Sequence, residues 1–581
     1  MECFLLSLSV GELPMIFYDY EVFKYDWLVV LMDTNAKKET VIVNNPEHLN
    51  EFHRDHKSEI WVGYNSNGYD RYIQKAILCG FDPKEVNDFI ILKKKKGWEF
   101  SKALNRIQLF NYDAQTSRNY SLKQLEAFMG HDIRETTVPF DIDRKLTSEE
   151  LDEVIHYCRH DVSETIEVFR RQLNEFDAQL SLLREFDLPL RNISKTQAQL
   201  SATILGAVPL TDPDKDRFEI SLPKTMIIEK YTNVVKFFRG YNSYDMTLQT
   251  TISDVPHTFA GGGVHGAHRQ YQFECGPDEY MIMADVDQLY PSIMIKYNLL
   301  SRAVRQPEKF ENILDTSLRL KAECNKKARE PYKRICNITY GSEGDKYNPM
   351  YDPRNRLLVC IYGQLLLLDL IEKLEHIPSY RLIQSNTDGI LVRIKKEDFE
   401  WFDDVVYEWE ARTGLHMSFD FYKKIFQKDV NNYIIIDNKG GFKSKGAYAK
   451  KQNDLDYDLP IVNEAVVKYF TDGVPVRKTI NDCQEFIKFQ KVVKISGKYS
   501  YAIYGMKKKT ERVFRLFASK HGKQLMKVKN GIPEKISYTP EVCQIVNEDV
   551  NDMPIPEWLD KSWYIKMATK RINDYLGQNY N

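Results

Sequence analysis

The stretch EYMIMADVDQLYPSIMIKYN, residues 279–298, predicts a strand that delivers an acid to the start of a helix. The apolar run Met281–Ala284 is typical of a buried strand, and Asp285 follows it directly. Pro291, after Tyr290, favours the first turn of a helix. An acid at such a junction is often only a helix cap, so its role depends on the rest of the chain.

A second acid lies at the tip of a predicted hairpin. YRLIQSNTDGILVRI, residues 380–394, has two alternating apolar strands around an Asn-Thr-Asp-Gly turn that carries Asp388. Asn386 occupies a position where a metal-binding hairpin could have another acid. Between the two stretches, residues 318–344 have a helical pattern with Lys333, Asn337 and Tyr340 on one face.

Composition describes a large globular protein. The 581 residues suggest three or four domains, and 43% hydrophobic content fits packed cores. The net charge of −2 means that a polyanion would need local basic patches. Nine scattered cysteines without a Cys-x-x-Cys pair argue against structural zinc and disulfides. We expect a soluble, cytoplasmic monomer without a membrane span. We interpret residues 1–14 as an extension, or as the result of a wrongly assigned start, before a strand that starts at Met15.

The first third of the chain contains further acids in suggestive positions. Asp19 and Glu21 are two apart on a predicted strand, so both project from one face. Asp70 follows the apolar segment WVGYNSNGYDRYI, residues 61–73. Tyr157 and Asp161 are four apart on a predicted helix over 145–173. Each pattern alone is more often an exposed edge or a surface pair than a site.

Their order along the chain is more specific. Strand D-x-E, then N-x-x-x-Y-D, then Y-x-x-x-D resembles the three exonuclease motifs in the proofreading domain of family B DNA polymerases. DVDQLYPSIM resembles motif A of that family, K-x-x-x-N-x-x-Y-G resembles motif B, and NTDG resembles motif C, usually D-T-D-S. The chain departs from the family at Gln288, Asn386 and Gly389, the last replacing a serine whose role is mainly structural.

The resemblance covers most of the chain from Met15 and implies a multidomain α/β and α+β architecture, with an RNase H-like exonuclease domain and a right-hand polymerase of palm, fingers and thumb. The implied domains are the exonuclease at 15–180; a connecting helix, template loop and first part of the palm at 181–305; fingers at 306–345; palm at 346–430; and a primer-contacting segment and thumb at 431–581.

In the exonuclease domain the resemblance implies two Mg²⁺ or Mn²⁺ ions, because hard divalent ions prefer oxygen ligands. Tyr157 would orient the attacking water, and Asn65 opens the second motif. Ser121 and Leu122, in YSLKQL, would grip a single-stranded 3′ end, although an ordinary helix N-cap explains the same residues equally well. The implied metal ligands are Asp19, Glu21, Asp70 and Asp161.

In the polymerase domain the resemblance again implies two such ions, held by Asp285, Val286 and Asp388. Lys333 would stabilise charge on the triphosphate, and Lys321 could face it from a preceding helix. Tyr290 would exclude a ribose 2′-OH, and Asn337 and Tyr340 would pack against the nascent base pair. The implied DNA contacts are Phe259, Gly261 and Gly262 of a template loop (or flexible linker), with Tyr433, Lys443 and Lys445.

The last group belongs to a basic segment. Residues 423–451 contain eight lysines against two aspartates, which favours a surface that follows phosphates. A solvated charged face is the alternative. The primer-contacting lysine expected from the family is replaced by Asn431.

We therefore expect a phage-type DNA-directed DNA polymerase with 3′–5′ proofreading, acting on primer–template DNA and dNTPs, with replication accessory proteins possible. Forty-eight residues separate Asp285 from Lys333, and 48 separate Tyr340 from Asp388. These short intervals leave no room for the insertions of protein-primed relatives, so a nucleic-acid primer is expected. The alternatives are a proofreading nuclease with a decayed polymerase site and a non-catalytic primer–template binding protein, which primer extension would separate.

Overall fold

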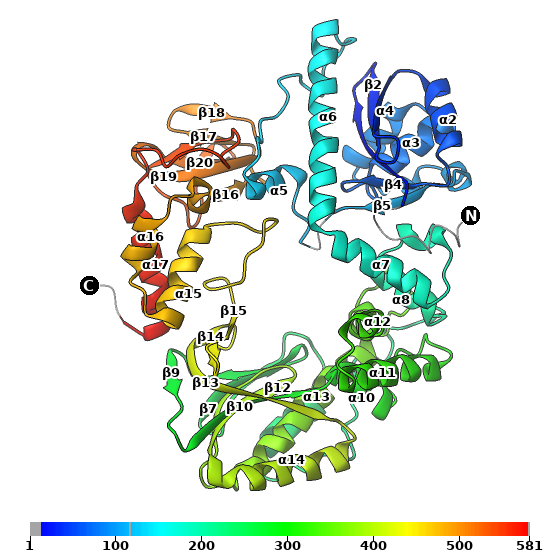
Figure 1. The fold of residues 1–581 in the computed structure, drawn as a ribbon. Helices are drawn as coiled ribbons and strands as arrows, with labels where there is room; N and C mark the ends of the chain where they lie inside the picture. Colours follow the sequence, from blue (N-terminus) through cyan, green and yellow to red (C-terminus); the bar gives the residue numbers. More distant parts are fainter. Residues whose placement is uncertain (1–12, 116–117, 579–581) are drawn as a thin grey trace. The chain divides into compact units, whose positions relative to one another are not determined.

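The computed structural model describes residues 13–115 and 118–578, coloured along the chain in Figure 1. They form two compact units. The first contains the chain up to Lys195 together with 452–461 and 482–564, and the second contains the remainder. The predicted extension, residues 1–14, lies outside the described residues except for its last two. The predicted domain boundaries stay predictions.

The first unit contains a mixed sheet with the strand order β3 (Lys38–Val43), β2 (Trp27–Asp33), β1 (Met15–Val22), β4 (Ile60–Gly63) and β5 (Phe110–Asp113). Strands β1, β2 and β3 are antiparallel, whereas β1–β4 and β4–β5 are parallel. The strand predicted to start at Met15 is confirmed.

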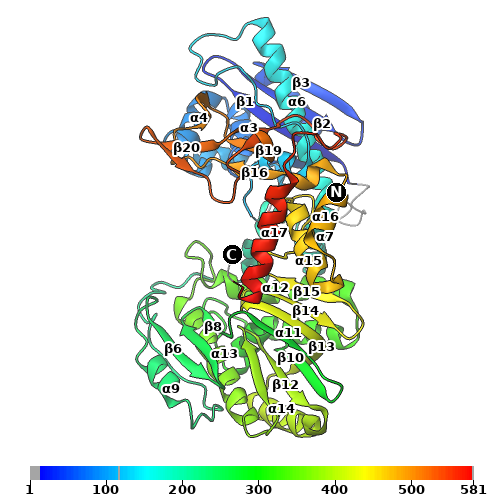
Figure 2. The ribbon, with the colours of Figure 1, turned by 90° about the vertical axis from the view of Figure 1, so that its left-hand side faces the viewer.

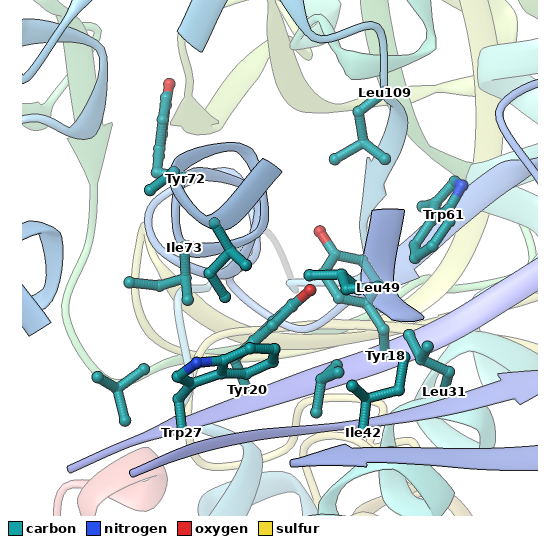
Figure 3. Packing of buried hydrophobic residues seen from close by; sticks show 14 of the residues in the cluster. Tyr18, Tyr20, Trp27, Leu31, Ile42, Leu49, Trp61, Tyr72, Ile73 and Leu109 are labelled. Atoms are coloured by element: carbon teal, nitrogen blue, oxygen red, sulfur yellow. The ribbon is translucent and has the colours of Figure 1, made fainter. Parts of the chain in front are cut away.

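Alternation along β1 sends successive side chains to opposite faces of this sheet. Tyr18 and Tyr20 join a buried cluster with Trp61 and with Tyr72 of α3 (Asp70–Leu78), as Figure 3 shows. Phe17 points the other way and packs edge-to-face on Phe169 of α6 (Ser148–Arg171). The odd-numbered residues of β1, including the predicted acids, therefore lie on the face that α6 covers.

The β-module, residues 486–550, also belongs to the first unit. One of its sheets has the order β16 (Lys491–Lys494), β19 (Val513–Lys523) and β22 (Cys543–Ile545). A second has the order β18 (Lys507–Lys509), β17 (Tyr501–Tyr504), β20 (Leu525–Lys529) and β21 (Ile532–Lys535). Strands β16 and β19 pack on the short helix α5 (Leu122–Met129), beside which they lie in Figure 1.

The second unit is organised around a large sheet. Strand β10 (Glu279–Val286) lies between β12 (Gly389–Lys395) and β13 (Met417–Asp429), with antiparallel pairing on both sides (Figure 2). Beyond β12 come β11 (Arg381–Ser385), β8 (Gly263–Ala267), β7 (Val255–Ala260) and β6 (Thr247–Ile252). Beyond β13 come β14 (Asn432–Asp437) and β15 (Phe442–Lys445), and β9 (Tyr271–Glu274) also pairs with β13.

Helices complete the second unit. The predicted strand-to-helix junction at 279–298 is confirmed, because β10 is followed by α10 (Leu289–Lys296), which packs on the long buried helix α13 (Pro353–Leu374). Helices α11 (Pro307–Ala322) and α12 (Lys326–Ser342) pack against each other. The hairpin predicted at 380–394 is confirmed as β11–β12. Within the described residues, no helix combines the length and apolarity that a membrane span requires.

Candidate active sites

Three of the four acids predicted in the first unit form a cluster. Asp19 and Glu21 project from β1 toward α6, which carries Asp161, and a carboxylate oxygen from each lies within 4.8 Å of the others. Asp70, the fourth, opens α3 and accepts a hydrogen bond of 3.3 Å from the main-chain N–H of Tyr20. Residues far apart in the sequence thus meet at one end of β1.

The cluster is electrostatically strained. Burial, and then repulsion from the other acids, raises the pKa of both Asp19 and Glu21 well above the usual range. Burial also raises the pKa of Asp70 to about 7 and that of Asp161 to about 6. A divalent cation among these oxygens would relieve the repulsion, so the donor set fits a hard metal ion.

Lys123 is a site residue that the sequence reasoning missed. Its Nζ lies 2.9 Å from Oδ1 of Asp161 and 3.0 Å from Oε2 of Glu126, which is itself fully buried. The ammonium group also lies 4.8 Å from the centre of the Tyr157 ring. A lysine three residues before a glutamate on a helix is common, so the sequence offered no distinctive signal.

The other residues predicted for this site lie in different surroundings. Tyr157 has a pKa raised by burial and then by Asp161, so its phenol stays a proton donor at neutral pH. Asn65 is exposed in a left-handed turn after β4 (φ 55°). Ser121 is the N-cap of α5, with its main-chain N–H 3.1 Å from Oε1 of Gln124, so the helix-cap alternative describes the structure. Leu122 packs partly on the adjacent core.

In the second unit, the strand pairing brings Asp285 and Asp388 together. Asp285 pairs with Gly389 in the β10–β12 register, and the N–H of Val286 donates to the carbonyl of Asp388 at 2.8 Å. Burial, followed by repulsion from Asp388, raises the pKa of Asp285 to about 6. Asp388 itself is exposed at the tip of the hairpin.

The surroundings of Gly389 leave no room for a side-chain carbon, which the sequence did not predict. A Cβ built there would lie 2.0 Å from Oδ1 of Asp285 and 2.7 Å from the carbonyl oxygen of Ala284. The serine usual in the related motif would therefore collide with the acid of β10. A glycine at this position leaves room for the carboxylate of Asp285.

A cavity of about 180 Å³ opens beside the two acids. Lys443, on its rim, donates to Oδ2 of Asp420 at 2.8 Å, and this bond raises its pKa despite the opposing effect of burial. Asp420, on β13, was not predicted. The cavity lining includes the predicted residues Asp285, Asn386, Asp388, Tyr433 and Lys443. Lys445 lies opposite Tyr433 in the β14–β15 register.

The predicted nucleotide-binding residues occupy α10, α11 and α12. The rings of Tyr290 and Tyr340 lie 4.2 Å apart between centroids, and the Tyr340 hydroxyl is 2.7 Å from Sγ of Cys360. Lys321 forms an ion pair with Asp287 and donates to Oγ of Ser418 at 2.7 Å. Lys333 and Asn337 are exposed on α12.

The glycine-rich segment, expected as a template loop or a flexible linker, is the turn of a β-hairpin. Strands β7 and β8 pair up to Ala260 and Gly263, leaving Gly261 and Gly262 at the turn. Phe259 is 1% exposed and packs on Phe238, so its ring has no surface to offer to DNA. The DNA contact expected of Phe259 is thus not supported, because pairing of β7 turns this side chain into the core.

No protein-family model and no curated protein matches the chain. Among solved structures, the family B DNA polymerase from the hyperthermophilic archaeon Pyrobaculum calidifontis is similar with a TM-score of 0.44 and 14% sequence identity, over 98% of this chain and 78% of that chain. This likeness carries no argument about the chemistry of the sites, which rests on the residues described above.

Proposed function

We propose that the protein is a DNA-directed DNA polymerase with a 3′–5′ exonuclease activity. One observation carries the proposal: each compact unit contains its own cluster of carboxylates at the end of a central strand, Asp19, Glu21 and Asp161 in one and Asp285 and Asp388 in the other. Two separate acidic sites fit an enzyme that forms phosphodiester bonds at one and hydrolyses them at the other.

In the first unit, Asp19, Glu21, Asp70 and Asp161 would hold Mg²⁺ or Mn²⁺. When bound, two such ions supply a more acidic attacking water and stabilise the leaving oxygen. Tyr157 stays protonated and can hydrogen-bond the water that attacks the phosphodiester. Lys123 places a permanent positive charge against Asp161, where negative charge on a scissile phosphate would also develop.

In the second unit, Asp285 and Asp388, with the carbonyl of Val286, would hold the same kind of ion. Lys321 and Lys333 would neutralise the triphosphate of a dNTP, and binding would require Lys321 to exchange Asp287 for phosphate. Tyr290, whose ring is tilted against that of Tyr340, presents a packed ring that would exclude a 2′-OH by collision.

The mode of priming follows from the intervals between these residues. The segment from Tyr340 to Asp388 consists of the end of α12, α13, β11 and short connections. No inserted domain is present there among the described residues. We therefore propose a nucleic-acid primer and a phage-type replicative role, in the cytoplasm of the host cell, with the protein acting as a monomer on primer–template DNA.

A second candidate, a nuclease with a decayed polymerase site, is favoured by Asn386, an amide in place of a motif C acid. The space that Gly389 provides for Asp285 speaks for a maintained polymerase site.

The test is a 5′-labelled primer–template incubated with Mg²⁺, first with and then without dNTPs. Extension with dNTPs and shortening without them are expected. Shortening under both conditions would favour the second candidate, and an unchanged primer would favour a protein that only binds primer ends.

A further inference from the structure

The β-module is joined to the helix that carries Lys123. Helix α5 ends at Met129, and Gly130 follows it in the left-handed conformation (φ 85°). The N–H of Val550 donates to the carbonyl of Gly130 at 2.8 Å, and the N–H of Ile133 donates to that of Asn547 at 2.8 Å. The residues that follow α5 are therefore bonded to a segment of the β-module more than 400 residues away in sequence.

Arg515 of β19 is the centre of this junction. Its side chain is fully buried. Nη2 donates to the carbonyls of His131 at 2.7 Å, Ala127 at 3.1 Å and, at the limit of a hydrogen bond, Glu126 at 3.5 Å, while Nη1 donates to that of Glu548 at 2.7 Å. The guanidinium thus donates to main-chain carbonyls in the last turn of α5, just after the helix and in the segment that ends the β-module.

A buried guanidinium in such surroundings is costly to maintain. Among the described residues its hydrogen bonds go to main-chain carbonyls and not to a carboxylate. The negative end of the helix compensates part of the desolvation, but packed apolar residues usually stabilise as well or better. The guanidinium instead contributes a geometric constraint. Because its donors form a planar fork, it fixes both the axial position and the rotation of α5.

That position bears directly on the acidic cluster. The main chain of Glu126 faces Arg515, and its side chain accepts the hydrogen bond of Lys123, which in turn reaches Asp161. A shift of about 1 Å in the end of α5 would move Lys123 by a similar amount, and displacements of that size commonly cost about 10²-fold in rate.

We propose that Arg515 is a positioning residue of the nuclease site, and that the β-module is therefore part of the nuclease. This inference rests on the proposed nuclease function. The guanidinium holds α5 so that Glu126 keeps Lys123 against Asp161. Arg515 itself contacts neither the acids nor the substrate.

The experiment compares wild type, Arg515→Lys, Arg515→Met and the control Tyr504→Phe, all as full-length proteins. Tyr504→Phe removes a hydrogen bond of 2.7 Å to the carbonyl of Cys543 inside the β-module without touching α5. Degradation of a single-stranded 3′ end with Mg²⁺ is measured for kcat and KM, and primer extension is measured on the same preparations.

The Met variant is expected to lower kcat of degradation by roughly 10- to 100-fold, with KM and extension within about twofold of wild type. The Lys variant should retain part of the activity, because an ammonium can still donate to some of the carbonyls. Hydrogen exchange in residues 122–133 should rise in both variants and stay unchanged in Tyr504→Phe.

A double-mutant cycle separates positioning from general destabilisation and uses the milder Arg515→Lys. If Arg515 acts through Lys123, adding Arg515→Lys to Lys123→Met lowers degradation no further than Lys123→Met alone. Independent, multiplicative losses would overturn the inference, as would a Met variant that degrades at the wild-type rate. Wild type that leaves 3′ ends intact would overturn the proposed nuclease function, and the inference with it.

Discussion

Replacing Gly389 by serine, the residue usual in the related motif, should damage polymerisation. The added Cβ would lie 2.0 Å from Oδ1 of Asp285 and 2.7 Å from the carbonyl oxygen of Ala284, where ordinary contacts are 3.4–4 Å. The carboxylate can rotate away, but the carbonyl belongs to β10, which is held between β12 and β13. Asp285 would therefore leave its position beside Asp388.

The size of the effect follows from these contacts. Overpacking of this kind costs about 1–3 kcal/mol of stability, which a protein of this size can tolerate. Displacing a carboxylate from a metal site by about 1 Å costs about 10²-fold or more in rate. We expect Gly389→Ala and Gly389→Ser to fold, and to slow single-turnover nucleotide incorporation by at least about 10²-fold while degradation of 3′ ends stays at the wild-type rate.

Gly240→Ala provides the matched control, because a Cβ there meets its nearest atoms at an unstrained 3.8 Å in the same unit. It should extend primers like wild type. Normal incorporation by Gly389→Ser would show that Asp285 does not depend on this glycine, and would refute the steric reasoning.

Three further outcomes are expected. Asp388→Asn should slow incorporation by about 10²-fold or more while sparing degradation, because a charge beside Asp285 is lost, whereas Asn386→Asp should be tolerated or mildly activating. Single-turnover incorporation with Mg²⁺ and Mn²⁺ checks both variants, and normal extension by Asp388→Asn would mean that motif C is misplaced. Tyr290→Val should raise ribonucleotide incorporation relative to deoxynucleotide incorporation, and an unchanged ratio would remove Tyr290 from that role. Asp70 has a pKa of about 7 in the fold against about 3.9 in an unfolded chain, so without metal the folded state loses stability as pH rises from about 4 to 7. Asp70→Asn should therefore stabilise the metal-free protein by on the order of 2 kcal/mol at pH 8 and by little at pH 4, as thermal unfolding at the two pH values would show.

The sequence could predict elements whose signals are local. Asp285 at the end of an apolar run and Asp388 in an Asn-Thr-Asp-Gly turn were placed correctly on β10 and at the β11–β12 turn. The meeting of Asp19 and Glu21 with Asp161 was implied by the order of the motifs and agrees with the structure.

The remainder depends on contacts between distant residues. Lys123 is 38 positions from Asp161, and Arg515 is 389 positions from Glu126, so no spacing rule could pair them. The need for Gly389 arises from the register of β10 against β12. The burial of Phe259, which the family resemblance placed at the DNA, arises from pairing of β7 and β8, which no local pattern announced.

The most direct test of two independent sites is a reciprocal measurement on one labelled primer–template. Asp19→Ala combined with Glu21→Ala should abolish shortening of the primer without dNTPs and leave extension intact, whereas Asp388→Asn should do the reverse. Loss of both activities in either folded variant, or of neither in both, would contradict the assignment of one reaction to each acidic cluster.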